Sequence, residues 1–127
     1  MSAERDRERM ADMLGALRKV HVFTHGLDAE QFAADERTQY AVIALLEIVG
    51  EAAGKVSAPV RATYTDVAWR SLVGMRNHLI HGYNEVDLGV VWTAVTREVP
   101  SLTAALERAL ATWTAPAPPT PSSGGSL

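Results

Sequence analysis

Apolar residues recur at spacings of three and four along most of the chain, and this spacing predicts helices. No stretch shows the alternation of apolar and polar residues that is typical of a strand, so we expect an all-α fold. The preponderance of alanine, leucine and valine over aromatic residues favours helices packed on helices. The expected helices cover residues 4–24, 36–55, 67–80, 88–98 and 101–112.

Polar residues and prolines indicate where these helices begin and end. Asp28 and Gln31 have the spacing of a capping box, which predicts a short turn or helix after the first long one. We expect residues 56–66 to form a loop broken by Pro59, because proline disrupts the interior of a helix. For the same reason we expect residues 99–101 to interrupt the last helical stretch.

The helix expected over residues 36–55 is apolar on more than one side. Such a helix has more than one face to bury. One face is expected to meet the core of the domain, and the other can meet a second copy of the chain. Small residues would let another backbone approach closely, and they are Ala41, Ala44, Gly50 and Ala52.

Length and composition fit one domain followed by a short tail. The chain has 127 residues, of which 47% are hydrophobic, and this is enough for a single core. We expect the helical domain to occupy residues 1–113. Residues 114–127 are rich in proline, serine and glycine, cannot bury much apolar area, and are expected to be disordered.

Several classes of function are disfavoured by what the sequence lacks. There is no cysteine, which removes disulfides, thiolate nucleophiles and cysteine-based zinc sites. His21 and His25 are four residues apart, as metal ligands on a helix can be, but no third ligand is evident. No signal peptide or membrane-spanning run is apparent, so we expect a cytoplasmic protein. The net charge of −3 disfavours a broad nucleic-acid binder more than a small nuclease that needs few phosphate contacts.

The stretch Arg76-Asn77-His78-Leu79-Ile80-His81-Gly82-Tyr83 carries the most distinctive chemistry in the chain. An arginine presents a fixed, positively charged fork that suits phosphate. A histidine can accept or donate a proton near neutral pH. Together the two side chains provide the two functions that RNA cleavage without a metal needs at minimum, a cation for the phosphate and a group for proton transfer.

On an ideal helix, Arg76 and His81 point about 140° apart. Arg76 falls in an apolar stripe, where an unpaired charge is costly to bury. We therefore expect it either to pair with a carboxylate such as Glu47 or Glu51 or to face a cleft. The two groups can meet on one substrate if the helix unwinds at Gly82, or if two copies of the motif face each other across a two-fold axis.

This stretch resembles the signature of the HEPN superfamily, in which an arginine and a histidine are separated by four to six residues and a polar residue follows the arginine. Arg76, Asn77 and His81 fit the four-residue form, and Tyr83 extends it to the Arg-x4-His-x-Tyr form of HepT-type toxins. The likeness covers roughly residues 4–110. The further segments that carry it, in the same order, are Asp35-Glu36-Arg37-Thr38, Leu46–Ala53, Trp69-Arg70, Gly74–Asn77 and Val91-Trp92.

The resemblance implies an up-and-down bundle of four or five helices that forms a homodimer, with the paired motifs lining a cleft at the interface. It also implies an endoribonuclease that needs no metal and no cofactor. If the roles of the family's motif residues apply to this chain, Arg76 would hold the phosphate and stabilise charge in the transition state. His81 would take the ribose 2′-OH proton or protonate the leaving oxygen, and Asn77 would orient either group.

The resemblance further implies a partner, a minimal nucleotidyltransferase that acts as the antitoxin by adding AMP to the tyrosine of the motif, here Tyr83. The added bulk and negative charge beside Arg76 and His81 would block a substrate phosphate. The number of AMP groups, and whether the RNA target is tRNA or mRNA, stay open at this point.

Ordinary structural roles are the alternatives for the same residues. Arg76 can be part of an ion pair, and His81 can be a surface histidine favoured by the negative end of a helix. His78 is an extra titratable group, expected at a solvated surface or an interface rather than in a catalytic role, where it could at most support the site. Tyr83 can simply extend the apolar stripe. The corresponding function is a non-catalytic helical subunit that binds a nucleotidyltransferase partner.

Overall fold

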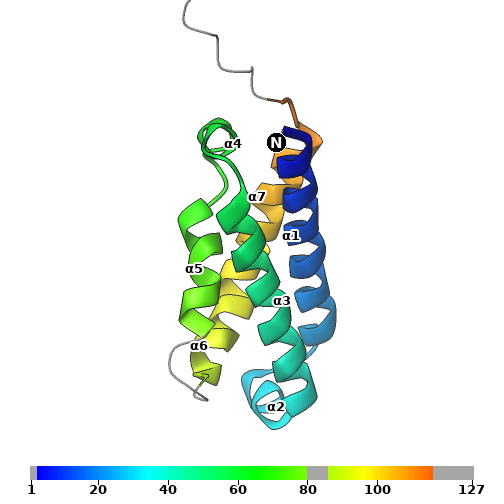
Figure 1. Ribbon diagram of the computed structural model, residues 1–127. Coiled ribbons are helices and arrows are strands. Elements are labelled where there is room, and N and C mark those ends of the chain that lie inside the picture. The colour runs from blue at the N-terminus through cyan, green and yellow to red at the C-terminus, as the bar shows by residue number, and fades with distance from the viewer. Residues whose placement is uncertain (1–2, 80–85, 116–127) are drawn as a thin grey trace, which may run out of the picture.

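The computed structural model describes residues 3–79 and 86–115, which form a bundle of long helices with short helices at its ends (Figure 1). No strand occurs within these ranges, and the prediction of an all-α bundle is confirmed. The elements are α1 (Ala3–Thr24), α2 (Ala29–Ala34), α3 (Glu36–Lys55), α4 (Ala58–Thr63), α5 (Trp69–Leu79), α6 (Leu88–Thr93), η1 (Ala94–Glu98) and α7 (Val99–Ala111).

Four rods make up the bundle. They are α1, α3, α5, and a single helical run formed by α6, η1 and α7 (Figure 1). Helix α3 packs against both α1 and α5, and α7 packs against α1. Burying one large aliphatic or aromatic side chain contributes about 1.5–3 kcal/mol. The largest fully buried side chains are Phe32, Met10, Met13, Leu17, Leu46, Leu72 and Leu106.

Helix α3 begins and ends where the sequence predicted, and polar groups fix both of its ends. At its start, the carboxylate of Asp35 accepts hydrogen bonds from the Thr38 N–H at 3.0 Å and the Thr38 hydroxyl at 2.6 Å. At the start of the preceding helix, α2, the capping box of Asp28 and Gln31 is confirmed in full. Each cap satisfies backbone N–H groups that have no partner inside the helix.

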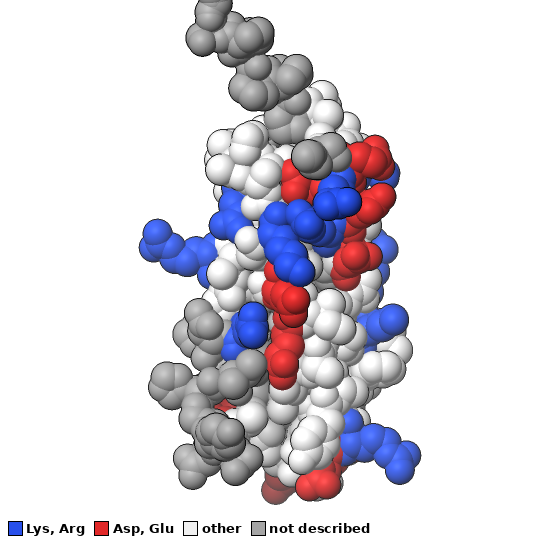
Figure 2. All heavy atoms as spheres, viewed as in Figure 1, with Lys and Arg blue, Asp and Glu red and all other residues white. Residues whose placement is uncertain are grey.

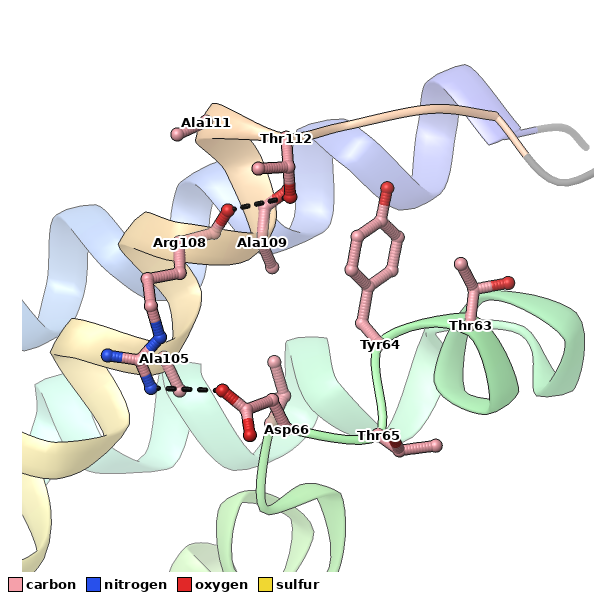
Figure 3. Close-up of a pocket in the computed structure, with 10 residues that line it drawn as sticks. Thr63, Tyr64, Thr65, Asp66, Ala105, Arg108, Ala109, Ala111 and Thr112 are labelled. Carbon is pink, nitrogen blue, oxygen red and sulfur yellow. Dashed lines mark hydrogen bonds and ion pairs between the residues drawn. The ribbon is translucent and has the colours of Figure 1, made fainter.

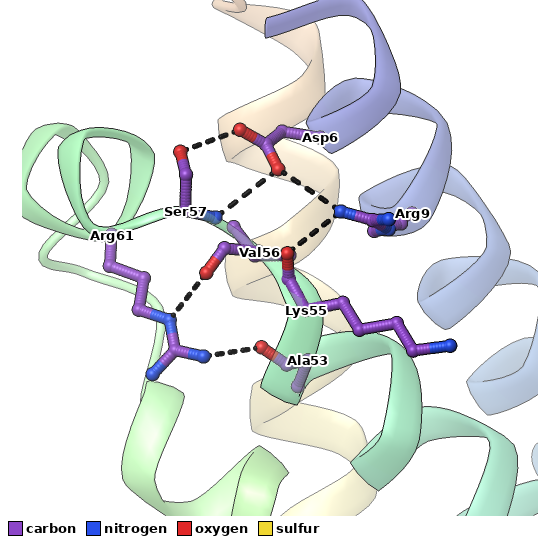
Figure 4. A network of polar contacts seen from close by, with 7 residues as sticks. All are labelled: Asp6, Arg9, Ala53, Lys55, Val56, Ser57 and Arg61. Atoms are coloured by element: carbon purple, nitrogen blue, oxygen red, sulfur yellow. Dashed lines mark hydrogen bonds and ion pairs between the residues drawn. The ribbon is translucent and has the colours of Figure 1, made fainter. Parts of the chain in front are cut away.

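The C-terminal end of α3 is held by two arginines (Figure 4). Arg61 donates to the carbonyl oxygens of Ala53 at 2.7 Å and Val56 at 3.0 Å. Arg9, on α1, donates to the Lys55 carbonyl at 2.8 Å. These donors supply partners to carbonyls at the end of the helix, where the intrahelical ladder runs out, and their positive charge suits the negative end of the helix dipole.

Asp6 ties the same end of α3 to α1 (Figure 4). Its side chain is buried and accepts hydrogen bonds from the backbone N–H of Ser57 at 3.2 Å and the Ser57 hydroxyl at 2.6 Å. A buried carboxylate without partners would destabilise the fold, so these bonds also fix where α1 lies against the start of α4.

The expected loop over residues 56–66 was wrong in part, because α4 occupies its middle. Pro59 lies in the first turn of this helix. Backbone N–H groups in the first turn have no acceptor inside the helix, so the lack of an N–H in proline costs no hydrogen bond there, and the fixed φ angle of proline suits the helix. Proline thus starts an element here instead of breaking one. The following helix, α5, begins at Trp69, and Val67 is buried in the connection before it.

The expected interruption at residues 99–101 was also wrong. The helical run from α6 continues through η1 into α7, and η1 is a π-helical turn. There the Val99 N–H donates to the carbonyl of Ala94, five residues earlier. Pro100 cannot donate a backbone hydrogen bond, and the wider turn before it lets the helix pass through this position without a break.

The Asp35 cap predicts a pH-dependent contribution to stability. The hydrogen bonds from the Thr38 hydroxyl and N–H hold the pKa of Asp35 below its ordinary value of 3.8. A carboxyl whose pKa is lowered by folding stabilises the fold fully above the ordinary pKa, and this stabilisation is lost as the pH falls through the lowered value. We expect Asp35→Ala to lower the melting temperature by a few degrees at pH 7.

The difference in unfolding free energy between wild type and Asp35→Ala, measured by denaturant titration, should stay constant from about pH 7 to 5 and shrink below about pH 4. Asp35→Asn is the matched control, because it can cap the helix without titrating. A wild-type–alanine difference that stays unchanged down to about pH 2.5 would contradict this account of the cap.

The last described residues are tied to the bundle by Tyr64. Its hydroxyl accepts a hydrogen bond from the Thr114 N–H at 2.7 Å, and its ring stacks on Trp113 at a centroid distance of 5.3 Å. Residues 116–127 lie outside the described ranges, so the predicted division at residue 113 stays a prediction. Within the described ranges, none of the helices combines the length and apolar character needed to cross a membrane.

Candidate functional site

Helix α5 carries the described part of the predicted site. Arg76 lies near its C-terminal end, and its side chain is exposed. The backbones of Asn77 and His78 continue the helix, but their side chains lie outside what the structure describes, as do the whole of His81 and Tyr83. The structure therefore gives the surroundings of Arg76, and the approach of Arg76 to His81 stays a prediction.

The place of Arg76 on α5 differs from the one expected. Leu72 and Met75 are the core-facing residues of the helix, with 0% and 3% of their surfaces exposed. Arg76 therefore lies at the edge of the buried face and not in its middle. Its guanidinium stays in solvent, so the expected cost of burying the charge does not arise.

What lies against Arg76 is the backbone of α3 at Gly50. Gly50 is buried, and a Cβ atom built on it would lie 2.9 Å from both the Cβ and the backbone N of Arg76. From the sequence, Gly50 was expected to let the backbone of a second subunit approach closely. In the structure this position is occupied by α5 of the same chain, which packs along α3 (Figure 1).

Gly50 is the residue of the candidate site whose role the sequence analysis missed. A glycine inside a helix costs about 1 kcal/mol relative to alanine, which is a signal that something else requires it. The signal is not specific, however. Gly54, one turn further along α3, has no neighbour within 4 Å of a built Cβ atom.

The ion pair expected between Arg76 and a carboxylate of α3 is absent from the described part of the chain. Glu51 instead pairs with Lys55, whose ammonium is 3.4 Å away. Glu47 is half-buried and takes part in none of the ion pairs found there. Within residues 3–79 and 86–115, the Arg76 guanidinium also forms no ion pair and is free to meet an anion.

The charges around Arg76 are mixed. Figure 2 shows acidic side chains in a column over α3, with basic side chains over α5 beside it. The acidic residues of α3 are Glu36, Glu47 and Glu51, and the arginines of α5 are Arg70 and Arg76. Carboxylates repel a polyanion that follows the column, so this surface suits one local phosphate contact better than a long track of them.

The outward face of α3 carries exposed apolar side chains. Tyr40, Ala44 and Ile48 are spaced four apart, and 69% of Tyr40 and 50% of Ile48 are exposed. Residues at this spacing share one side of a helix. The prediction that α3 is apolar on a second side is confirmed, and this side is open in the single chain.

The remaining candidates have ordinary structural surroundings. The rings of His21 and His25 lie 5.2 Å apart on α1, and both residues are exposed. The described ranges contain no group of three or more histidine, cysteine, aspartate or glutamate residues placed to hold a metal. Trp92 packs on Phe32 at 5.0 Å, and the Trp69 Nε1–H donates to the Tyr64 carbonyl at 2.9 Å.

A surface pocket of about 350 Å³ lies between the loop after α4 and the end of α7 (Figure 3). Arg108 and Asp66 form an ion pair of 3.1 Å across it, and both side chains are largely exposed. Tyr64 and several threonines and alanines complete its lining. None of the predicted site residues lines this pocket, so it does not replace the surface around Arg76 as the candidate site.

Comparison with known proteins identifies the family to which the chain belongs. The family described as "Ribonuclease HepT-like" matches residues 13–109. "Probable ribonuclease HepT" of Thermococcus cleftensis is 34% identical over 80% of this chain and 93% of its own length. "Putative RNase MJ0125" of Methanocaldococcus jannaschii is 35% identical over 76% of this chain and 84% of its own. No solved structure gives a significant match. The chain therefore belongs to the HepT-like ribonuclease family, within the HEPN superfamily.

Proposed function

We propose that this chain is a metal-independent endoribonuclease and the toxin of a HepT/nucleotidyltransferase type toxin–antitoxin system. The observation that carries the proposal is Arg76. In a chain of the HepT-like ribonuclease family, the arginine of the motif is exposed, makes no ion pair within the described residues, and has its backbone packed on α3. An arginine that is exposed and unpaired within the described residues leaves its guanidinium accessible to a substrate phosphate.

The reaction proceeds by attack of the ribose 2′-OH on the adjacent phosphorus. One group removes the proton of the 2′-OH as the O2′–P bond forms, and the P–O5′ bond breaks as the 5′ oxygen gains a proton. The products are a 2′,3′-cyclic phosphate and a free 5′-OH. His81 serves in one of the two proton transfers, Arg76 stabilises the charge on the phosphoryl oxygens, and Asn77 orients either group.

The active form is a homodimer. Two motifs facing each other across a two-fold axis let Arg76 of one subunit and His81 of the other meet at one phosphate, which a single regular helix does not allow. The open apolar side of α3, formed by Tyr40, Ala44 and Ile48, supports this assignment, because it is an exposed apolar surface that a second subunit could cover.

The substrate is RNA held through few phosphates, and tRNA and mRNA are both candidates. The acidic column on α3 and the net charge of −3 oppose tight binding of a long RNA backbone. Specificity then depends on local contacts near the cut. Such an enzyme is expected to bind substrate with an affinity that depends only weakly on salt concentration.

The test of the proposed activity is cleavage of RNA by the purified, unmodified protein in the presence of EDTA, for wild type against Arg76→Ala. Mass spectrometry of the fragments checks for the 2′,3′-cyclic phosphate. If the wild-type protein leaves RNA intact while it still binds its nucleotidyltransferase partner, the chain is the non-catalytic subunit that the motif also allowed.

Regulation is proposed to act through Tyr83. A minimal nucleotidyltransferase adds AMP to its hydroxyl, which places a negatively charged group near Arg76 and His81 and excludes a substrate phosphate by charge and bulk. Because no carboxylate neutralises Arg76 within the described residues, its guanidinium is free to pair with the phosphate of the added AMP.

We expect co-expression with the nucleotidyltransferase to add one or more AMP groups to the chain, each of which raises the intact mass by about 329 Da from simple atom balance. The modified protein should lose RNA cleavage almost completely. Tyr83→Phe should keep its unmodified mass, whereas Tyr40→Phe, which changes an exposed tyrosine on α3, should still be modified. AMP retained on Tyr83→Phe would exclude this tyrosine as the acceptor.

A further inference from the structure

The contact between Gly50 and Arg76 is a meeting of two backbones. Gly50 lies in α3 and Arg76 in α5, and a Cβ atom on Gly50 would stand 2.9 Å from the Arg76 backbone N and 3.4 Å from its Cα. A flexible side-chain end can rotate away from an intruding methyl group, but a helix backbone cannot. Any residue other than glycine at position 50 must therefore push the two helices apart at Arg76.

Other glycines of the chain show that this contact is specific. Gly54 lies four residues further along α3, and Gly15 lies in α1, and at neither does a built Cβ atom meet anything within 4 Å. The three glycines carry the same cost in helix propensity. Only Gly50 among them uses the missing side chain for close packing.

We propose that Gly50 is a positioning residue for catalysis, because its missing side chain sets how closely Arg76 stands to α3. The inference rests on the proposed function, in which Arg76 contacts the phosphate. The Arg76 side chain is exposed and forms no ion pair within the described residues, so no carboxylate there fixes the guanidinium. What the structure does fix is the origin of the side chain, because the Cα, Cβ and backbone N of Arg76 are the atoms against Gly50.

The displacement that a methyl group forces is large enough to matter for catalysis. To relax the 2.9 Å approach to an ordinary contact of 3.4 Å, α5 must move by about 0.5 Å at Arg76. A misplacement of about 1 Å can cost a factor of about 10² in rate. We therefore expect Gly50→Ala to lower kcat by about 10- to 100-fold, with a smaller effect on KM.

The experiment compares Gly50→Ala with Gly54→Ala, the same substitution one turn away on the same helix. Helicity, melting temperature, kcat and KM are measured for both, with RNA as substrate. Gly54→Ala should match wild type in kcat. A third protein, the double variant Gly50→Ala/Arg76→Ala, should cleave no more slowly than Arg76→Ala alone under single-turnover conditions, because Gly50 acts through Arg76.

Each outcome has a definite meaning. If Arg76→Ala cleaves RNA as wild type does, the proposed function fails, whatever Gly50→Ala does. If Arg76→Ala is inactive but Gly50→Ala and Gly54→Ala have equal kcat, only the positioning role is overturned. The role is also overturned if Gly50→Ala does not fold, or if it lowers the residual rate of the Arg76→Ala protein, because the glycine is then a requirement of the bundle alone.

Discussion

Arg76→Ala is expected to lower the rate of RNA cleavage by about 10²–10³-fold while the fold stays intact. Removal of one group that stabilises charge in the transition state costs about this much in a preorganised site. The stability should change by less than about 0.5 kcal/mol, because the side chain is exposed and makes no ion pair within the described residues. The measurement is single-turnover cleavage in EDTA, together with the melting temperature.

Arg70→Ala provides the matched control, since Arg70 is also an exposed arginine of α5 and lies outside the motif. It should cleave RNA at nearly the wild-type rate. Arg76→Lys adds a graded test, because lysine keeps the charge but presents a point charge in place of the planar fork. Its rate should fall between those of wild type and Arg76→Ala. Equal losses in Arg70→Ala and Arg76→Ala would mean that α5 contributes only general positive charge.

The features that could be predicted from the sequence depend on residues close together along the chain. The capping box of Asp28 and Gln31 involves residues three apart, so its hydrogen bonds follow once a helix starts there. The limits of α3 follow from its long apolar periodicity. The motif of Arg76 and His81 is also recognised from residue types and spacing along the chain, but the approach of the two side chains in space stays a prediction.

The features that could not be predicted depend on how distant elements pack. Pro100 was expected to break a helix, but the π-helical turn before it accommodates the ring. The contact of Gly50 with Arg76 depends on which residue of α5 lies opposite which residue of α3, and periodicity does not give this register. The exposure of Arg76 has the same origin, since packing on α3 and the rest of the bundle places Met75 in the core and leaves its neighbour at the edge.

The outward side of α3 should prove essential for activity if the site is shared between two subunits. We expect Ile48→Glu to weaken the homodimer by 10²-fold or more, about 3 kcal/mol, because the interface would have to bury an unpaired carboxylate. Ile48 is half exposed in the single chain, so the substitution should leave the fold of each subunit unchanged. RNA cleavage should fall by a similar factor at protein concentrations where the variant is monomeric.

Val22→Glu is the control for this experiment, because it places the same charge at an exposed apolar position, 68% accessible, on α1. It should remain dimeric and active. Light scattering coupled to gel filtration gives the oligomeric state, and cleavage is measured on the same fractions.

If Ile48→Glu stays dimeric, the subunits meet through another face. If it is monomeric and still cleaves RNA at the wild-type rate, one chain holds a complete site. In that case the helix must unwind after Arg76 for its own His81 to reach the phosphate, because a regular helix turns the two side chains about 140° apart.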